Sequence, residues 1–523
     1  MKRKIDIYGL ALIAGSLLYL VSIIWINFNG NQWYSFDIYS DAFVAKLMAE
    51  QNTLFPDNWV FGNQYYVIAT PVLAALIYTA CHNSVLALAI ASCIMTVAVL
   101  FCFYWCIRPF VKKRSTWVGV FCMSGAVILG NSASSYMNGL QYFYTMASFY
   151  ACYVFVIFLT LGLFFRLLSS KRINSLAVAL NLLFSIALGM QSLRGTLVLH
   201  LPLLAVSVLL LFFKKIGKMP LLFSVTLLIA NVIGILVMKY IPTQSIAIIS
   251  DVKLTLEPAE LIGHLTNTFS EFLTITGLSF FQRGIKWLPL FCIATFFFGV
   301  VLWSIITIIR EKDFSVISIA ILFCLVSVLS VIAVGILMFQ VRSIYFFVWY
   351  LLVVFSFVYL IEKINRQNLF TVAILLCGAA SYFFNFYPDF SHFQSRNHFY
   401  QQISDELIEE KIDCVYYDWH TSPLFAVFSQ DRIVSGTVNL DLEKESGQLM
   451  YPVAYLLPVE VFENAGEYNS YLVFSNWTFD YLEQYASEEY IDELMSHLTF
   501  VKKVAYEDEE FTFYKFSPEL LSR

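Results

Sequence analysis

Charged residues are scarce in this chain of 523 residues. Only 13% are Asp, Glu, Lys or Arg, whereas 59% are hydrophobic; soluble domains average about 25% charged residues. A soluble protein of this length would divide into several domains with polar surfaces, which this composition does not supply. The composition therefore predicts a polytopic membrane protein and excludes disordered, collagen-like and secreted disulfide-scaffold classes.

The few charges are divided unevenly along the chain. Residues 388–523 contain 25 acidic and 8 basic residues, and residues 1–387 contain 12 acidic and 24 basic ones. The sequence thus predicts a basic membrane domain over 1–387 and an acidic domain over 388–523. Because the tail has no basic face and the other basic residues lie between apolar runs, we expect no nucleic-acid partner.

Apolar runs long enough to span a bilayer need about 20 residues. Including a first run that ends near Phe28, the sequence predicts about eleven transmembrane helices, the others at roughly 84–107, 117–131, 143–168, 174–190, 196–213, 219–240, 288–309, 314–338, 344–361 and 368–387. With a cytoplasmic N-terminus, every dense basic cluster falls on the cytoplasmic side, as the positive-inside rule requires. The fold class is therefore mainly α, a multi-pass plasma-membrane protein whose C-terminal domain is extracytoplasmic.

Two outer loops are long, at 29–83 and 241–286. In the second loop, Leu261, Leu265, Phe269 and Leu273 recur every four residues behind Glu257-Pro258. This spacing predicts an amphipathic helix at the membrane interface. Cys81 and Cys414 both fall on the outer side, where a disulfide between them is one alternative.

The acidic tail has the pattern of a small α/β domain. Helical sequence at 399–410 precedes a strand-like run at 414–417, and helical sequence at 421–428 precedes a second strand-like run at 432–438. A further strand at 471–474 leads into a helical stretch ending near His497, and 511–516 alternates like an edge strand. The tail shows no glycine-rich phosphate loop and no metal-ligand spacing, which favours a structural or acceptor-binding role over a catalytic one.

Two carboxylates in the first outer loop, Asp37 and Asp41, are the candidate catalytic residues. They stand four residues apart, so on a helix they share a face, and aromatic residues flank them. A carboxylate at the membrane surface suits a general base that acts on a hydroxyl or amine. The alternative is that both acids only provide a hydrated polar border at the outer end of the first transmembrane helix.

The order of features in residues 1–110 resembles the GT-C superfamily of integral-membrane glycosyltransferases. One span is followed by an Asp-containing outer loop, a helix with Ala45-Lys46-Leu47-Met48, a Pro56-Asp57-Asn58-Trp59 segment and a short second helix. The chain is similar to the protein O-mannosyl- and aminoarabinose-transferase types, and nearest to uncharacterised bacterial relatives. The family's Asp-Glu or Asp-x-Asp motif is here Asp-x-x-x-Asp, so both Asp37 and Asp41 remain candidates for the base.

The resemblance implies a donor sugar on a polyprenyl-phosphate carrier and a lipid, glycan or protein acceptor at the bilayer. The departing phosphate then needs positive charge, and arginine suits it because its planar fork offers paired donors. Arg194 and Arg342 lie in short outer turns and are the main candidates, with lipid-head-group snorkelling as the alternative. Weaker candidates for substrate or phosphate binding are Arg283, Lys286, Tyr136, Asn138 and His264.

His200 lies within an apolar span, where an ionisable group is either functional or a neutral core histidine. We expect no cofactor, although a divalent cation stays open, and no metal-binding residue is assigned.

The sequence thus predicts an enzyme that moves a sugar from a polyprenyl-phosphate carrier to a cell-envelope acceptor on the outer face. The alternatives are a transporter or flippase of a lipid-linked glycan, which more often shows internal repeats, and a polysaccharide polymerase or ligase centred on the 241–286 loop.

Overall fold

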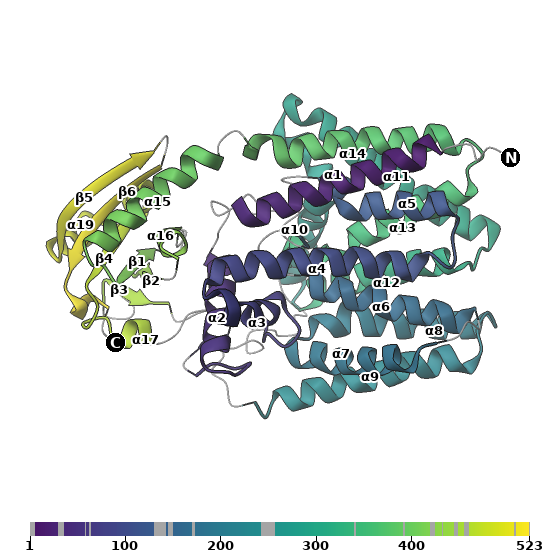
Figure 1. Cartoon of the computed structure of the whole chain (residues 1–523), viewed down its shortest axis with the longest axis horizontal. Helices are drawn as coiled ribbons and strands as arrows, with labels where there is room; N and C mark the ends of the chain where they lie inside the picture. Colours follow the sequence, from purple (N-terminus) through teal and green to yellow (C-terminus); the bar gives the residue numbers. More distant parts are fainter. Residues whose placement is uncertain are drawn as a thin grey trace.

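The computed structural model describes most of the chain, namely residues 6–29, 36–57, 59–61, 64–129, 143–144, 150–169, 173–241, 257–338, 341–390, 393–418, 424–430, 432–443, 448–453, 460–506 and 509–521. A bundle of apolar helices is followed by a mixed sheet with helices (Figure 1). The start of α1 (Ile7–Asn29) and the sheet lie at opposite ends of the bundle, which we call the N-terminal end and the sheet end.

The bundle is built from α1 and ten further helical segments. They are α4 (Ser84–Ile107), α5 (Lys113–Phe121) with η2 (Cys122–Ala126), α6 (Ala151–Leu168), α7 (Ser175–Gln191), η4 (Thr196–His200) with α8 (Leu201–Phe212), α9 (Lys218–Met238), α11 (Leu288–Glu311), α12 (Val316–Leu337), α13 (Val348–Lys363) and α14 (Gln367–Phe390). At the sheet end lie α2 (Phe36–Glu50) and α3 (Thr70–Cys81), with α10 (Pro258–Thr276) and the short turns η5 (Leu278–Arg283), η6 (Ile285–Trp287) and η7 (Ser343–Phe346) in the later loops.

The sequence predicted eleven spans, which is more than the number of helices whose length and apolar composition allow them to cross a membrane. Among the described residues, eight helices are long and apolar enough to cross a membrane. Of the other three predicted spans, two correspond to the shorter apolar helices Ser175–Gln191 and Thr196–Phe212. The third is α5, which continues into the π-helical turn η2 and has a non-helical residue at Gly125. The chain is a multi-pass membrane protein in which some helices are short or irregular.

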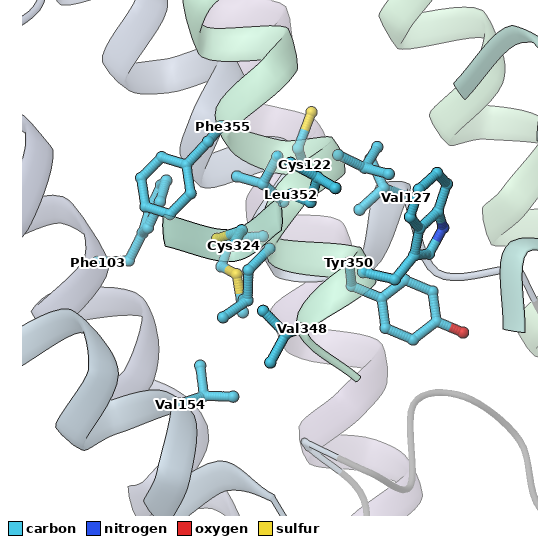
Figure 2. Close-up of a cluster of buried hydrophobic side chains, with 14 of the residues drawn as sticks. Phe103, Cys122, Val127, Val154, Cys324, Val348, Tyr350, Leu352 and Phe355 are labelled. Atoms are coloured by element: carbon cyan, nitrogen blue, oxygen red, sulfur yellow. The ribbon is translucent and has the colours of Figure 1, made fainter. Parts of the chain in front are cut away.

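Helix α13 is the centre of the bundle. Nearly all of its residues are buried, including both aromatic and aliphatic side chains. Figure 2 shows Phe103 of α4, Val154 of α6 and Cys324 of α12 converging on side chains of α13. A helix that is apolar on all sides is expected where it packs against protein all round.

Two glycines allow α7 and α9 to approach closely. A Cβ atom on Gly189 would overlap the backbone carbonyl of Asn231, and a Cβ on Gly234 would overlap that of Ile186. Small residues at a helix crossing permit such backbone contact, which replaces the hydrophobic effect as the cause of association within a bilayer. This contact fixes the end of α7, where the candidate site begins.

Ion pairs join basic and acidic residues from distant parts of the chain at the N-terminal end of the bundle. Arg114 pairs with Asp6 at 2.8 Å and Lys112 with Glu362 at 3.5 Å. Lys363 lies 2.8 Å from Glu311. These contacts bring residues from the start, the middle and the end of the helical region to one end, and the side of the membrane that this end faces stays a prediction.

The amphipathic helix predicted in the second outer loop is α10. It begins at Pro258, and Gly277 ends it in a left-handed conformation, φ 78°, that glycine adopts without strain. Three residues of the predicted apolar stripe, Leu265, Phe269 and Leu273, are exposed, whereas the opposite face packs against α12 and η7. The stripe therefore points away from the protein.

The C-terminal sheet has six strands in the order β3-β2-β1-β4-β6-β5. They are β1 (Cys414–Asp418), β2 (Val434–Leu440), β3 (Met450–Pro452), β4 (Ser470–Ser475), β5 (Leu498–Tyr506) and β6 (Glu509–Phe516). Strands β2 and β4 both run parallel to β1, and the other pairs are antiparallel. The accompanying helices are α15 (Phe393–Glu409), α16 (Leu424–Phe428), α17 (Glu460–Glu463), α18 (Asn476–Tyr485) and α19 (Glu488–Ser496), with the final turn η8 (Pro518–Leu520).

One expectation for the tail is wrong in detail, and the alternative of a disulfide between Cys81 and Cys414 is excluded. The strand at 511–516 is not an edge strand, because β6 pairs with β4 on one side and β5 on the other. Cys81 and Cys414 are both free, so they form no disulfide. Cys414 is buried in β1, and its burial raises the pKa of the thiol to about 12.

One cluster of buried hydrophobic residues extends from α2 and α3 into the C-terminal sheet. It includes Ala45, Trp59 and Tyr78 on the bundle side and Tyr400 and Phe425 on the sheet side. Figure 1 shows α2 and α3 between the bundle and the sheet. The segment that carries the two candidate aspartates thus lies between the two parts of the molecule.

Candidate functional site

Helix α2 carries both candidate bases. Its second half contains strong helix formers such as Ala45, Leu47 and Met48, and the chain leaves the helix through Asn52 in a left-handed conformation. As predicted, Asp37 and Asp41 therefore stand one helical turn apart. The side chain of Asp37 lies outside the described residues. Asp41 is 2% exposed, and the residues from Ser40 to Ala45 are all buried.

The loop after α2 is held by aromatic side chains. Phe61 contacts Tyr65 with ring centroids 5.1 Å apart and Phe55 at 6.0 Å. Trp59 and Phe61 are buried. This packing holds Phe61 and Tyr65 together, and the loop presents the residues from Gln64 onward to the bundle.

Gln191, the last residue of α7, fastens this loop to the bundle. Its side-chain Oε1 accepts hydrogen bonds from the backbone N–H of Val67 at 3.4 Å and of Ile68 at 3.2 Å. Its backbone carbonyl accepts from the N–H of Tyr65 at 2.9 Å. Its Nε2 donates to the hydroxyl of Tyr153 at 3.2 Å. Gln191 therefore binds the backbone N–H groups of three loop residues, two of them through its buried side chain.

Arg194 lies three residues further on and binds the same loop. Its Nη1 donates to Oε1 of Gln64 at 3.1 Å. Its guanidinium carbon lies 5.1 Å from the ring centroid of Tyr150, 5.9 Å from that of Tyr153 and 5.0 Å from that of Tyr345. Rings at such distances attract a cation through their quadrupoles. The guanidinium is thus held in a fixed orientation by four side chains from three parts of the chain.

Tyr345 connects Arg194 to the turn of Arg342. The backbone N–H of Tyr345 donates to the carbonyl of Arg342 at 3.0 Å. The N–H of Ser343 donates to Oε2 of Glu271 on α10 at 2.5 Å. The structure therefore brings the two predicted arginine turns together at the sheet end. The side chain of Arg342 is exposed, unlike that of Arg194.

The remaining sequence candidates do not join this group within the described residues. His264 places Nδ1 3.3 Å from the carbonyl of Ile336, so its described contact is with the end of α12. Tyr136 and Asn138 lie outside the described residues. Arg283 ends η5 and Lys286 lies in η6, and their side chains are also outside the description.

His200 ends the π-helical segment η4 and is fully buried. Neither ring nitrogen has a hydrogen-bond partner among the residues that the structure describes. Nearby, Ser327 donates to the carbonyl of Val198 at 2.9 Å. His200 thus lies in the helix packing and not in the polar group around Arg194.

Sequence reasoning missed Gln64, Gln191, Tyr150, Tyr153 and Tyr345. Gln191 stands three residues before Arg194 and Tyr345 three residues after Arg342, so proximity to the arginines was a usable signal. Gln64 and the two tyrosines at the start of α6 carry no such signal, because their partners are distant in the sequence.

Metal ligands are not grouped in the described part of the chain. No three His, Cys, Asp or Glu side chains lie close enough there to hold an ion. The arrangement instead offers a fixed arginine, tyrosine hydroxyls and a helix with two carboxylates.

Comparison with known proteins gives similarity at the level of structure only. No family model matches the sequence, and no curated protein matches it. ArnT from Cupriavidus metallidurans, solved bound to undecaprenyl phosphate, is similar with a TM-score of 0.53 and 10% identity, over 95% of this chain and 97% of ArnT. The apo form of ArnT gives a TM-score of 0.41 and 9% identity, over 98% of this chain and 99% of ArnT.

A third similar structure is the oligosaccharyltransferase of Archaeoglobus fulgidus, tethered to an acceptor peptide that contains the NVT sequon. Its TM-score is 0.41 with 12% identity, over 82% of this chain and 64% of that protein. The likeness to ArnT extends through both the helical bundle and the C-terminal part, because it covers nearly all of each chain. The chain therefore has a GT-C-like fold, as its first 110 residues suggested.

Proposed function

We propose that the protein is a glycosyltransferase that moves a sugar from a polyprenyl-phosphate carrier to a cell-envelope acceptor. The observation that carries this proposal is the fixed guanidinium of Arg194, bonded to the loop that follows the two aspartates. The fold shared with ArnT, which was solved bound to undecaprenyl phosphate, supports a lipid-phosphate donor.

Arg194 is suited to the phosphate of the donor. Its contacts with Gln64 and the three tyrosines leave it preorganised, so that little reorientation accompanies the growth of charge on the leaving oxygen. Arg342, on the adjacent turn, supplies a second guanidinium that is exposed. We propose that Arg194 binds the carrier phosphate and that Arg342 guides the donor to it.

The reaction needs a base on the acceptor side. Asp37 or Asp41 takes the proton of the acceptor hydroxyl or amine while that atom forms a bond with the anomeric carbon of the sugar. The bond between the anomeric carbon and the phosphate oxygen breaks, and its electron pair stays on the lipid phosphate, which faces Arg194. No cofactor takes part in this scheme, and a divalent cation at the aspartates is an outcome of the experiments below.

The C-terminal residues 388–523 form the acceptor side in this proposal. They share a hydrophobic cluster with α2 and α3, so an acceptor held there lies beside the helix of the aspartates. We place this part outside the cell and the N-terminus in the cytoplasm.

The test is transfer by the purified protein in nanodiscs. A panel of polyprenyl-phosphate-linked sugars is supplied with cell-envelope glycan, lipid and protein fractions, and free polyprenyl phosphate and labelled acceptor are measured. We expect both products in equal amounts from at least one donor. If no donor is consumed while labelled donor moves between the leaflets of vesicles, the protein is a flippase and the proposal is wrong.

A further inference from the structure

Three aromatic side chains form a row along α18. Trp477, Tyr481 and Tyr485 recur every four residues, which places them on one face of a helix. The ring centroids of Trp477 and Tyr481 are 5.4 Å apart with an angle of 11° between the planes, and those of Tyr481 and Tyr485 are 5.1 Å apart. We call these three residues the aromatic row.

The aromatic row faces outward although the helix itself is firmly anchored. Trp477 is 39% and Tyr485 60% exposed and Tyr481 between them is half-buried, whereas Thr478 and Leu482, on the adjoining face of the helix, are buried. Ser475 and Thr478 form a capping box that fixes the start of α18. Because burial of Thr478 and Leu482 already holds α18 in place, the exposed rings are not needed to position the helix. Contiguous exposed aromatic surface is typical of an interaction site.

The charges in the stretch of sequence that contains the aromatic row have one sign. Residues 470–500, which include α18 and α19, contain six carboxylates and no Lys or Arg. Asp480 and Glu483 lie on α18 itself. Such a surface repels nucleic acids, anionic polymers and the head groups of anionic lipids, and it favours an uncharged or cationic partner.

We propose that the aromatic row is a docking site for a glycan that carries amino groups, and that this glycan is the acceptor. The second part rests on the proposed function. The C–H faces of sugar rings pack against aromatic faces, and a protonated amine is attracted both by aromatic quadrupoles and by carboxylates. Asn476 and Gln484, exposed at the ends of the same helix, offer hydrogen bonds to sugar hydroxyls. A continuous row of rings suits successive units of a sugar chain better than a single charged side chain of a peptide.

The experiment measures binding without any donor, so its result is independent of transfer. Full-length protein in nanodiscs of neutral lipid is titrated calorimetrically with a chitosan hexamer, with its N-acetylated counterpart and with an alginate hexamer of opposite charge. The variants are Trp477→Ala, Tyr485→Ala and the double variant. The matched control is Phe500→Ala, which removes an aromatic side chain that is also 60% exposed but lies on β5.

We expect the chitosan hexamer to bind most tightly, the alginate hexamer not at all, and each single variant to weaken binding at least tenfold while Phe500→Ala does not. The fold increase in Kd that each variant causes should become smaller with added salt, because part of the attraction that the variant loses is electrostatic. Equal binding by wild type and the double variant would overturn the proposal. So would a preference of the aromatic row for anionic vesicles, for a lysine-rich peptide or for a second copy of the chain.

Transfer to a small soluble acceptor separates this proposal from the function itself. If the double variant still transfers to a small acceptor but not to the hexamer, both proposals hold. If the wild type binds the hexamer through the aromatic row but transfers to nothing, the docking site stands and the glycosyltransferase proposal fails.

Discussion

Arg194 donates a 3.1 Å hydrogen bond from Nη1 to Oε1 of Gln64 and thereby joins a turn of the bundle to the loop behind the candidate aspartates. Gln64 also accepts from the hydroxyl of Tyr153 at 3.4 Å. The contact therefore couples the orientation of the guanidinium to the position of the loop, and the two parts of the proposed site depend on each other.

Replacing Arg194 by lysine should reduce transfer about 10²-fold, the usual effect of losing one preorganised donor at a developing oxyanion. A lysine keeps the charge but cannot form a planar, two-pronged contact while stacked among tyrosines. Initial rates against carrier concentration in nanodiscs provide the measurement. Arg342→Lys should also impair transfer, chiefly at low donor, because Arg342 is exposed.

Arg310→Lys is the matched control for both arginines, since it exchanges the same side chains at the last turn of α11 and at an exposed position. It should behave as wild type. If all three variants match wild type at every carrier concentration, the two arginines are membrane anchors and the phosphate site lies elsewhere.

Removal of the catalytic carboxylate by Asp→Asn should lower transfer about 10²- to 10⁴-fold, the range expected for a general base. We test Asp37→Asn and Asp41→Asn separately, with Asp57→Asn as an exposed control in the same loop. Wild-type rates in both of the first two variants contradict the mechanism. Loss in both indicates a shared proton or a bound cation, and addition of a chelator to the wild type distinguishes them.

Gln191→Met should lower kcat more than it changes the KM for the donor, because Gln191 positions the loop without being the phosphate ligand. The substitution keeps the length of the side chain but leaves the N–H groups of Val67 and Ile68 without their acceptor, at a cost of about 1–3 kcal/mol. Transfer kinetics and thermal unfolding are measured together.

Gln51→Met is the control for Gln191→Met, since Gln51 accepts a single hydrogen bond from the N–H of Asp57 at an exposed position. A purely structural role for Gln191 would lower the melting temperature and leave kcat of the folded protein unchanged. That outcome would remove Gln191 from the site.

His200→Leu should stabilise the protein by about 1–3 kcal/mol, because it removes a buried polar ring that has no partner in the described part of the chain. Transfer should stay at the wild-type rate. Thermal unfolding in detergent and a transfer assay decide between this view and a functional role. A strong loss of transfer with unchanged stability would make His200 functional.

Membrane orientation is tested with an impermeant thiol reagent on intact cells. Tyr451→Cys should react and Lys113→Cys should not, in a background that carries Cys292→Ser to remove an exposed native thiol. Tyr451 is a suitable position because it is 38% exposed, whereas its neighbour Met450 is fully buried. The reverse pattern would invert the protein and contradict the proposed outer-face reaction.

Much of the fold follows from local sequence patterns. Long apolar runs predict α4, α12 and α14 directly, and turn residues between short apolar runs predict β1, β2 and β4. Helices α7 and α8 are apolar but shorter, so counting apolar runs overestimated the spans. Strand β5 was missed because Lys502 and Lys503 interrupt its apolar character; Lys502 pairs at 2.8 Å with Glu410, directly after α15, a partner far away in the sequence.

The candidate site was harder to predict than the fold. The aspartates and arginines stand out because charges are rare in an apolar chain. Gln64 and Tyr153 do not, since their importance comes from a hydrogen bond between residues 89 positions apart. Only the packing of the loop against α6 and α7 brings them together.

The burial of α13 has a consequence for how the protein is made. Of the helices that surround it, α4, α5, α6, α11 and α12 all leave the ribosome earlier, and only α14 leaves later. During synthesis α13 therefore leaves its contacts with lipid and packs against helices that were made before it. This exchange gains little from the hydrophobic effect, because lipid tails are as apolar as its neighbours. Side-chain fit, as between Phe355 and the rings of Phe103 and Phe158, must then drive the packing of α13 into the bundle.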